Sequence, residues 1–194
     1  MAGLYLEEFA EGQLFRHQIT RTITEADNVL FSVMTMNPQP LHIDFDFSAK
    51  TEWGKPLVNS LFTLGLMIGI SVHDTTLGTT VANLGMKETA FPHPLFHGDT
   101  VRIETEVKSV RESKSKPDRG IVEFEHRAYN QNNVLVARTL RQAMIAAGLD
   151  PAGIPGCRLD PTDALGFIEV HIEQGPVLEE LGLALGVVTS INGS

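Results

Sequence analysis

The sequence is poor in cysteine and in positive charge. Cys157 is the single cysteine among 194 residues, so no disulfide can form within the chain. Lys and Arg number 15 against 24 Asp and Glu, which gives a formal net charge of −9. Nucleic-acid phosphates require a basic surface, so we expect no nucleic-acid partner. Any anionic ligand must instead meet a local basic cluster.

Long apolar runs and several well-known motifs are also missing. The most apolar stretch, residues 61–72, falls short of the ~18 residues that cross a bilayer, so we expect no membrane association. The N-terminus is acidic where a signal peptide is basic, which favours a cytoplasmic protein. GxGxxG, GxxxxGK[ST] and GxSxG are absent, and the histidines before residue 148 lack metal-site spacing. No nucleotide-phosphate loop, serine-hydrolase elbow or metal is therefore expected there.

The polar and apolar pattern predicts an α+β fold. Residues 15–23 favour a strand, and Thr24 is expected to cap a short helix that ends in an irregular loop at the NPQPLH segment. Residues 58–72 are apolar on every face, which is typical of a helix surrounded by protein. Residues 78–147 then change period, and their last three segments alternate as half-buried antiparallel strands do. We expect a long curved antiparallel sheet around the central apolar helix.

A Pro- and Gly-rich connector, GLDPAGIPG, begins at residue 148. It predicts one domain over residues 1–147 and an appendage over residues 148–194.

The polar side chains of the proline-stiffened loop are the best candidates for chemistry. Asn37, Gln39, His42 and Asp44 gather just before the central helix, and a stiff loop can hold a reacting water in place. Histidine is the natural base near neutral pH, because its ordinary pKa is about 6.5. The alternative is that His42 only binds the backbone of a tight loop.

The loop also carries a resemblance to a known family. Residues 35–42, TMNPQPLH, resemble the T-G-D-x-N-P-[LIV]-H motif of the MaoC-like dehydratases, the (R)-specific enoyl-CoA hydratase group. FPHPLFHGDTVRIETEV resembles the same family's later strand entry, and the likeness runs over residues 5–147. The resemblance implies the hotdog fold, a homodimer or higher homo-oligomer, and an acyl-CoA thioester as substrate with no further cofactor. NPQPLH, PLVNSLFTLGL and SKSKPDRG most resemble the mesaconyl-CoA and itaconyl-CoA hydratases.

The chain departs from this family motif at three positions. Met36 replaces the glycine, Asn37 replaces the catalytic Asp and Gln39 replaces the Asn, while His42 is kept. In the family the Asp and His flank a water that adds to a 2-enoyl thioester. We expect His42 to activate the water, Asn37 to orient it and Asp44 to orient or supplement His42. A catalytically silent relative that only binds acyl-CoA is the alternative, since Asn cannot accept a proton.

Gln39 and three further groups of residues are expected to bind substrate. Backbone amides around Asn59 and Ser60 could hold the thioester oxygen, as the resemblance implies, although Ser60 could equally cap the helix. Lys55 is a candidate for the free carboxylate of a dicarboxylyl substrate. The third candidate is a basic turn that could meet coenzyme A phosphates or could simply be solvated: Lys114, Lys116 and Arg119.

The last 30 residues resemble a different family, the zinc amidohydrolases of N-carbamoyl amino acids and allantoate. The His of H-I-E-Q-G, a metal ligand there, corresponds to His171. The other ligands of such a site lie well upstream, where this chain has a different domain. We therefore expect a fragment without amidohydrolase activity, the alternative being a second, hydrolytic function.

Overall fold

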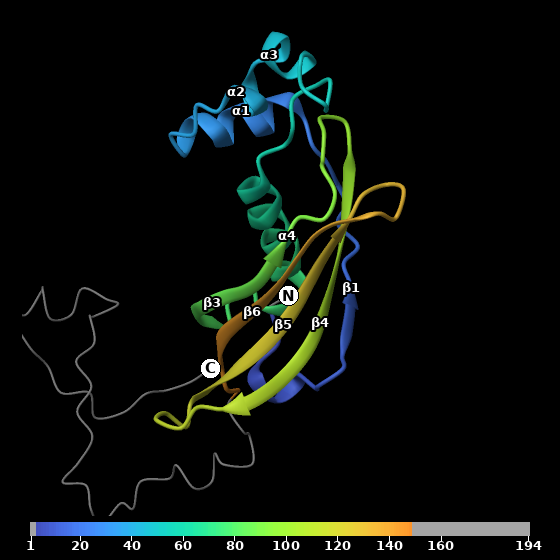
Figure 1. Cartoon of the computed structure of the whole chain (residues 1–194). Coiled ribbons are helices and arrows are strands. Elements are labelled where there is room, and N and C mark those ends of the chain that lie inside the picture. The colour runs from blue at the N-terminus through green and yellow to red at the C-terminus, as the bar shows by residue number, and fades with distance from the viewer. Residues whose placement is uncertain (1–2, 149–194) are drawn as a thin grey trace, which may run out of the picture. The chain divides into compact units, whose positions relative to one another are not determined.

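The computed structural model describes residues 3–148, so the predicted appendage from residue 149 onward lies outside the described range. The helices are η1 (Leu6–Glu8), α1 (Glu25–Met34), α2 (Pro40–Ile43), α3 (Phe45–Ala49) and α4 (Ser60–Thr75). The strands are β1 (Leu14–Arg16), β2 (Arg21–Thr22), β3 (Thr80–Ala90), β4 (Thr100–Glu112), β5 (Arg119–Tyr129) and β6 (Leu135–Ala146). Figure 1 shows the long strands curving past α4, with α1, α2 and α3 gathered at one end.

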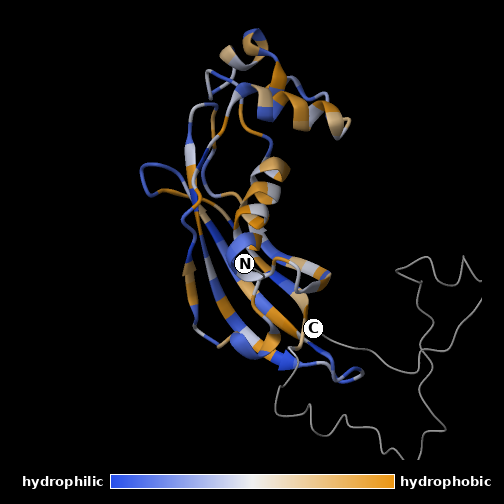
Figure 2. Ribbon diagram, turned by 180° about the vertical axis from the view of Figure 1, so that it is seen from behind, coloured by the Kyte–Doolittle hydropathy of each residue, from blue (hydrophilic) through white to orange (hydrophobic). Residues whose placement is uncertain are grey.

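The sheet is antiparallel throughout its described strands. Its order is β1-β4-β5-β6-β3, with β2 also paired to β4. The three predicted alternating strands β4, β5 and β6 are confirmed, and alternate residues of β4 and β5 are buried. The hydropathy colouring alternates along these strands accordingly (Figure 2). The α+β architecture of a curved sheet around an apolar helix is therefore confirmed.

Helix α1 begins where the sequence predicts. The Thr24 side chain accepts the Asp27 N–H, and the Asp27 carboxylate accepts the Thr24 N–H, which satisfies two groups at the helix start. The single strand expected over residues 15–23 is wrong, because β1 and β2 are separated by a bend. His17 follows β1, and its N–H still donates to the Ile103 carbonyl at 3.1 Å, while its ring contacts Asp74 and Thr105.

The irregular loop expected at NPQPLH is also partly wrong. Pro40 begins α2, where its missing N–H costs nothing because the first helical amides have no partner within the helix. Asp44 then caps α3, since its Oδ1 accepts the Phe47 N–H at 2.9 Å.

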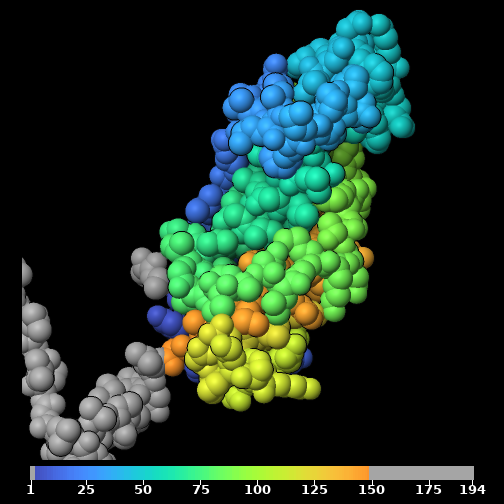
Figure 3. Space-filling model, turned by 90° about the vertical axis from the view of Figure 1, so that its left-hand side faces the viewer, coloured from blue at the N-terminus to red at the C-terminus, as the bar shows by residue number. Residues whose placement is uncertain are grey.

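Helix α4 is central but is not enclosed on every face in the single chain. Leu61 is 58% exposed, and nothing lies within 4 Å of a Cβ built at Gly65 or Gly69. These three residues, spaced four apart, form one face of the helix, here called the open α4 face. Figure 3 shows α4 at the surface between α1–α3 and β3. The expectation of protein on all sides of this helix is therefore wrong for one copy.

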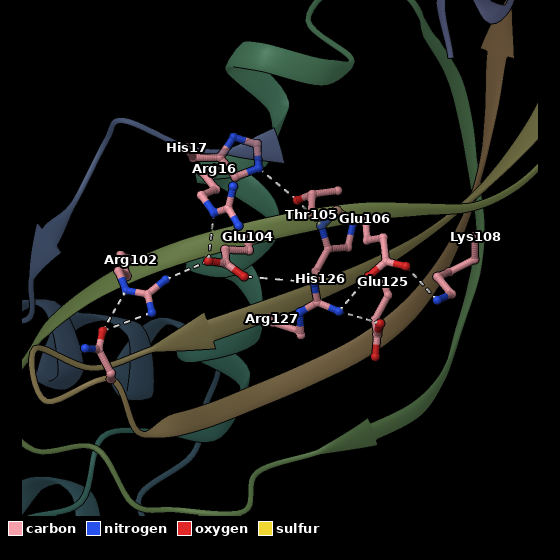
Figure 4. Close-up of polar contacts among 11 residues, drawn as sticks. Arg16, His17, Arg102, Glu104, Thr105, Glu106, Lys108, Glu125, His126 and Arg127 are labelled. Carbon is pink, nitrogen blue, oxygen red and sulfur yellow. Dashed lines mark hydrogen bonds and ion pairs between the residues drawn. The ribbon is translucent and has the colours of Figure 1, made fainter. Parts of the chain in front are cut away.

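The sheet face opposite the buried residues of β4 and β5 carries alternating charges. Arg127 of β5 donates to Glu106 at 2.9 Å and to Glu125 at 2.8 Å, while Arg102 donates to Glu104 at 3.0 Å (Figure 4). The Arg127–Glu106 pair joins β5 to β4, and such a cross-strand pair of opposite charges stabilises the pairing modestly. In the described range, no helix has the length and apolar character needed to cross a bilayer.

Candidate active site

The loop after α1 is held in a single shape by short-range hydrogen bonds. The Asn37 N–H donates to the Ser32 carbonyl at 2.9 Å, and the Asn37 Oδ1 accepts the Gln39 N–H at 3.2 Å. This second bond is an Asx turn, which occupies the side-chain oxygen and leaves the Asn37 NH₂ group as a donor. Gln39 is exposed and is the N-cap residue of α2. Its side chain makes no capping hydrogen bond, but its carbonyl accepts the His42 N–H at 3.0 Å.

His42 lies in α2 with its ring tied to the segment that precedes α4. Its Nδ1 is 2.9 Å from the Leu57 carbonyl oxygen. A carbonyl can only accept, so Nδ1 carries the proton and Nε2 of the neutral ring keeps a free lone pair. The expectation that His42 binds backbone and the expectation that it acts as a base are therefore compatible.

Asp44 does not support His42 in the way the sequence predicts. The prediction assumed an extended segment, in which residues two apart share a face. The backbone is helical over Pro40–Ile43 instead, and the Asp44 carboxylate is engaged in capping α3. The extended backbone assumed for this segment is therefore wrong, and the role of Asp44 as a partner of His42 stays a prediction.

The N-terminus of α4 separates the roles expected of Asn59 and Ser60. Asn59, not Ser60, is the cap: its Oδ1 accepts the Leu61 N–H at 3.0 Å. The Asn59 N–H is also occupied, because it donates to Asn28 at 2.8 Å. The Ser60 N–H has no acceptor within residues 3–148, so of these two amides it is the one available to a ligand oxygen.

A pocket of about 230 Å³ lies beside this helix start. Its walls are mostly apolar, with a few polar side chains. Leu57, whose carbonyl accepts from His42, and Ser60 both line it, whereas His42 and Asn37 are not among its lining residues. Sequence reasoning missed His93, which also lines the pocket and binds the Leu135 carbonyl through Nδ1 at 2.9 Å. The full list of lining residues is Trp53, Leu57, Val58, Ser60, Thr63, Phe91, Pro92, His93, Pro94, Leu95 and Val136.

Residues 8–129, which include the loop, α4 and the first long strands, match the family model described as the MaoC like domain. The chain belongs to the MaoC-like family.

Relatives of this family resemble the described domain over most of its length. Mesaconyl-CoA hydratase from Cereibacter sphaeroides is 28% identical over 144 residues, which cover 74% of this chain and 41% of that protein. A Mycobacterium tuberculosis protein described as having a double hotdog fold superposes with a TM-score of 0.70 at 26% identity, over 76% of this chain and 46% of that one. The described domain is thus one hotdog unit, and it spans under half the length of these two relatives.

The C-terminal part matches a different set of proteins. N-carbamoyl-L-amino acid amidohydrolase from Geobacillus stearothermophilus is 49% identical over 55 residues, which cover 28% of this chain and 13% of that enzyme. The second resemblance noted in the sequence is confirmed at this partial coverage. His171 and the rest of that segment lie outside the described residues.

One departure from the MaoC-like motif, Met36, and one candidate substrate-binding residue, Lys55, have distinctive local structures. Met36, at the glycine position, adopts a φ of 57° and is 87% exposed. Lys55 is exposed to solvent, and its Nζ lies 4.2 Å from the centre of the Phe96 ring, which is a cation–π contact.

The Met36 conformation gives a direct stability prediction. A left-handed backbone costs a residue with a Cβ about 1 kcal/mol, and glycine escapes most of this cost. We expect Met36→Gly to raise the free energy of unfolding by up to about 1 kcal/mol, measured by urea unfolding. Met34→Gly is the matched control, because Met34 is similarly exposed but helical, and there glycine should destabilise. Equal losses in both variants would contradict the prediction.

The basic turn does not lie near this site within one chain. Lys114 and Lys116 lie in the β4–β5 connection and Arg119 begins β5, at the opposite end of the sheet from α1–α3 (Figure 1). The Asp118 carbonyl of that turn accepts the Ala147 N–H. The neighbouring Ala146 N–H donates to the carbonyl of Thr79, which lies just beyond the C-terminus of α4. A helix of 16 residues is about 24 Å long, and His42 is tied to its other end.

Arg119 is also already paired, with two 2.7 Å hydrogen bonds to Asp118. Within one chain this turn therefore lies away from His42, and its role toward coenzyme A phosphates stays a prediction.

Proposed function

We propose that the chain is a hydro-lyase that adds water reversibly to the double bond of a 2-enoyl-CoA. The observation that carries the proposal is the fixed tautomer of His42, with Nδ1–H on the Leu57 carbonyl and Nε2 free to act as base. Membership of a family whose relatives include a mesaconyl-CoA hydratase supports this reaction class. The thioester is the substrate, and the proposal includes no further cofactor.

The reaction proposed here uses one base on one face of the double bond. His42 Nε2 takes a proton from water while the water oxygen bonds to C3, and the electron pair moves to the thioester oxygen. The Ser60 N–H, at the positive end of α4, stabilises that enolate oxygen. The enolate then collapses as the His42 imidazolium returns a proton to C2. Asn37 offers NH₂ hydrogens that orient the water, since its oxygen is engaged with Gln39.

For the substrate, we propose a branched dicarboxylyl-CoA such as mesaconyl-CoA or itaconyl-CoA. The exposed Lys55 ammonium is the cation proposed to meet the free carboxylate. The relative named mesaconyl-CoA hydratase supports this choice at 28% identity.

The test is loss of enoyl-thioester absorbance with crotonyl-CoA, a longer straight-chain enoyl-CoA, mesaconyl-CoA and itaconyl-CoA. Turnover of a dicarboxylyl ester in preference to crotonyl-CoA supports the full proposal. Turnover of straight chains alone supports the hydro-lyase and contradicts the role of Lys55.

Binding without catalysis is the second candidate, and Asn37 is the observation that favours it. An amide cannot exchange a proton with substrate as the family's carboxylic acid does. CoA esters that bind without any loss of absorbance would establish this candidate.

We propose that the catalytic unit is a homodimer or higher homo-oligomer. The open α4 face is uncovered, and β3 pairs with β6 but with no second strand in the described range. An edge strand that exposes Val81, Leu84 and Met86 is a surface for pairing with another chain. A solution mass equal to that of one 21.2 kDa chain, measured by light scattering, would contradict this part of the proposal.

For the C-terminal segment we propose no amidohydrolase activity, because the similarity covers only 13% of that relative. Stoichiometric zinc in the purified full chain, lost in His171→Ala, would contradict this.

Asn37 gives the smaller of the kinetic predictions. Asn37→Ala removes the proposed water-orienting donor, so we expect kcat to fall about tenfold with little change in KM. Steady-state kinetics on the preferred ester measures both constants. Asn37→Asp is the matched comparison, because a carboxylate can still accept the Gln39 N–H while restoring the family's acid. An Asn37→Ala variant with the kcat of the parent would remove Asn37 from the mechanism.

A further inference from the structure

Asn28, on α1, joins four segments of the chain around the candidate site. It is fully buried. Its Nδ2 lies 2.9 Å from the His42 carbonyl oxygen, 3.0 Å from the Leu57 carbonyl oxygen and 3.0 Å from His97 Nε2. Its Oδ1 accepts the Asn59 N–H at 2.8 Å. One short side chain thus contacts α2, the segment before α4, the cap of α4 and the turn that leads into β4.

The chemistry of these partners fixes which atom of the amide is which. The two carbonyl oxygens can only accept and the Asn59 N–H can only donate, so the amide cannot be turned over. The two Nδ2 hydrogens are shared among three acceptors, and a protonated His97 Nε2 would set one N–H against another at 3.0 Å. His97 Nε2 is therefore bare, and its neutral ring is protonated at Nδ1. Burial lowers the pKa of His97, which favours this neutral form; the Glu25 carboxylate partly opposes the shift and the Lys55 ammonium adds to it.

The Leu57 carbonyl is shared between Asn28 and the candidate base. It accepts from Asn28 Nδ2 and also from His42 Nδ1 at 2.9 Å. On its other side Asn28 holds the Asn59 amide, whose neighbour Ser60 has the available N–H. The same side chain therefore fixes the acceptor that sets the His42 tautomer and the backbone that places the Ser60 amide.

We propose that Asn28 is a positioning residue, which sets the His42 ring and the Ser60 amide relative to each other. Its kinetic consequence rests on the proposed hydratase function, whereas its effect on the His42 tautomer does not. No other residue type of this size supplies both donors and an acceptor: aspartate would place an oxygen against two carbonyl oxygens, and alanine would leave buried backbone groups without partners.

The experiment uses the full chain with ¹⁵N-labelled histidine. In the parent protein, two-bond ¹H–¹⁵N spectra should show His42 protonated at Nδ1 and bare at Nε2, with His97 likewise bare at Nε2. In Asn28→Ala and Asn28→Asp we expect His42 to populate both tautomers. We expect kcat for the preferred enoyl-CoA to fall about 100-fold, as misplacement of about 1 Å produces, while KM changes little.

Ser32→Ala is the matched control. Ser32 is also fully buried on α1, one turn further along, and it contacts the Asn59 side chain at 3.4 Å. This variant should lose some stability but keep the His42 tautomer and the parental kcat. Circular dichroism confirms that the variants compared are folded.

Three results would overturn the proposal. One is an Asn28→Ala variant that keeps the pure Nδ1–H tautomer of His42 and the kcat of Ser32→Ala. Another is a parent protein in which either His42 or His97 is protonated at Nε2. This spectrum needs only the parent protein, so it decides the question even if no Asn28 variant folds. The third is a parallel loss of tautomer and kcat in Ser32→Ala. If the parent protein turns over no thioester, the proposed function fails, and the tautomer spectra alone decide the positioning role.

Discussion

Replacing His42 with alanine should lower kcat about 1000-fold on the preferred enoyl-CoA while leaving the chain folded. General acid–base catalysis by one positioned side chain contributes roughly 10²- to 10⁴-fold. His42 is both the base and the returning acid of the proposed reaction, so its loss removes both proton transfers. The ring makes one hydrogen bond, to the Leu57 carbonyl, and is half-buried, so the fold should tolerate its removal. Initial rates at saturating substrate give kcat.

The control for this prediction is another histidine outside the site. His73 lies in the last turn of α4, at the far end of the helix from His42, and its ring bonds the neighbouring Asp74. His73→Ala should keep the parental kcat. An active His42→Ala variant would refute the assignment of the base. An inactive His73→Ala variant would show that activity responds to any disturbance of α4.

Much of the fold follows from periodicity in the sequence. Thr24 begins α1 as its capping pattern predicts, and the alternation in β4, β5 and β6 matches the buried face of the sheet. The central helix is offset by two to three residues, because Asn59 caps it through its side chain. Helices α2 and α3 were missed, since four- and five-residue helices contain no apolar period to detect.

Site residues could be predicted only where a short sequence motif identifies them. His42 is identified by its neighbours in the sequence, within a motif of eight residues. Asn28 could not be found this way, because its role depends on Leu57, Asn59 and His97, which lie 29 to 69 residues away. The choice between Asn59 and Ser60 depends on the same long-range contact. The geometry expected around Asp44 was wrong for a related reason, since helix formation at α2 and α3 changed which residues share a face.

The second large effect concerns stability in acid, and it depends on His126 in β5. This ring is fully buried in the sheet, where its Nδ1 lies 2.9 Å from the Thr105 hydroxyl and its Nε2 has no partner in the described range. Burial lowers the pKa of His126 to about 3, and the neighbouring Arg141 and His17 act in the same direction. The folded chain therefore holds His126 neutral at pH values where the unfolded chain would protonate it.

The sign of the pH effect follows from proton linkage. Between pH 6.5 and about 3 the unfolded state binds a proton at His126 that the folded state does not, so stability falls as the pH falls through this range. At about 1.4 kcal/mol per pH unit, we expect a loss of about 3 kcal/mol between pH 6.5 and 4. The hydrogen bond from His17 lowers the pKa of Asp74 below its ordinary 3.8. The stability that the ionised Asp74 contributes is therefore lost only at pH values below the range in which His126 acts.

Urea unfolding of the parent, His126→Gln and His73→Gln at pH 7, 5.5 and 4.5 measures this effect. Glutamine cannot titrate but keeps an amide that can bond Thr105, so His126→Gln should show a much flatter pH dependence even if it is less stable at pH 7. His73 is exposed, and its replacement should leave the parental slope unchanged. Parallel slopes for the parent and His126→Gln would show that the folded chain accepts a proton at the buried ring. In that case the space around Nε2 would have to admit water, because a buried imidazolium beside the Arg141 cation requires solvation.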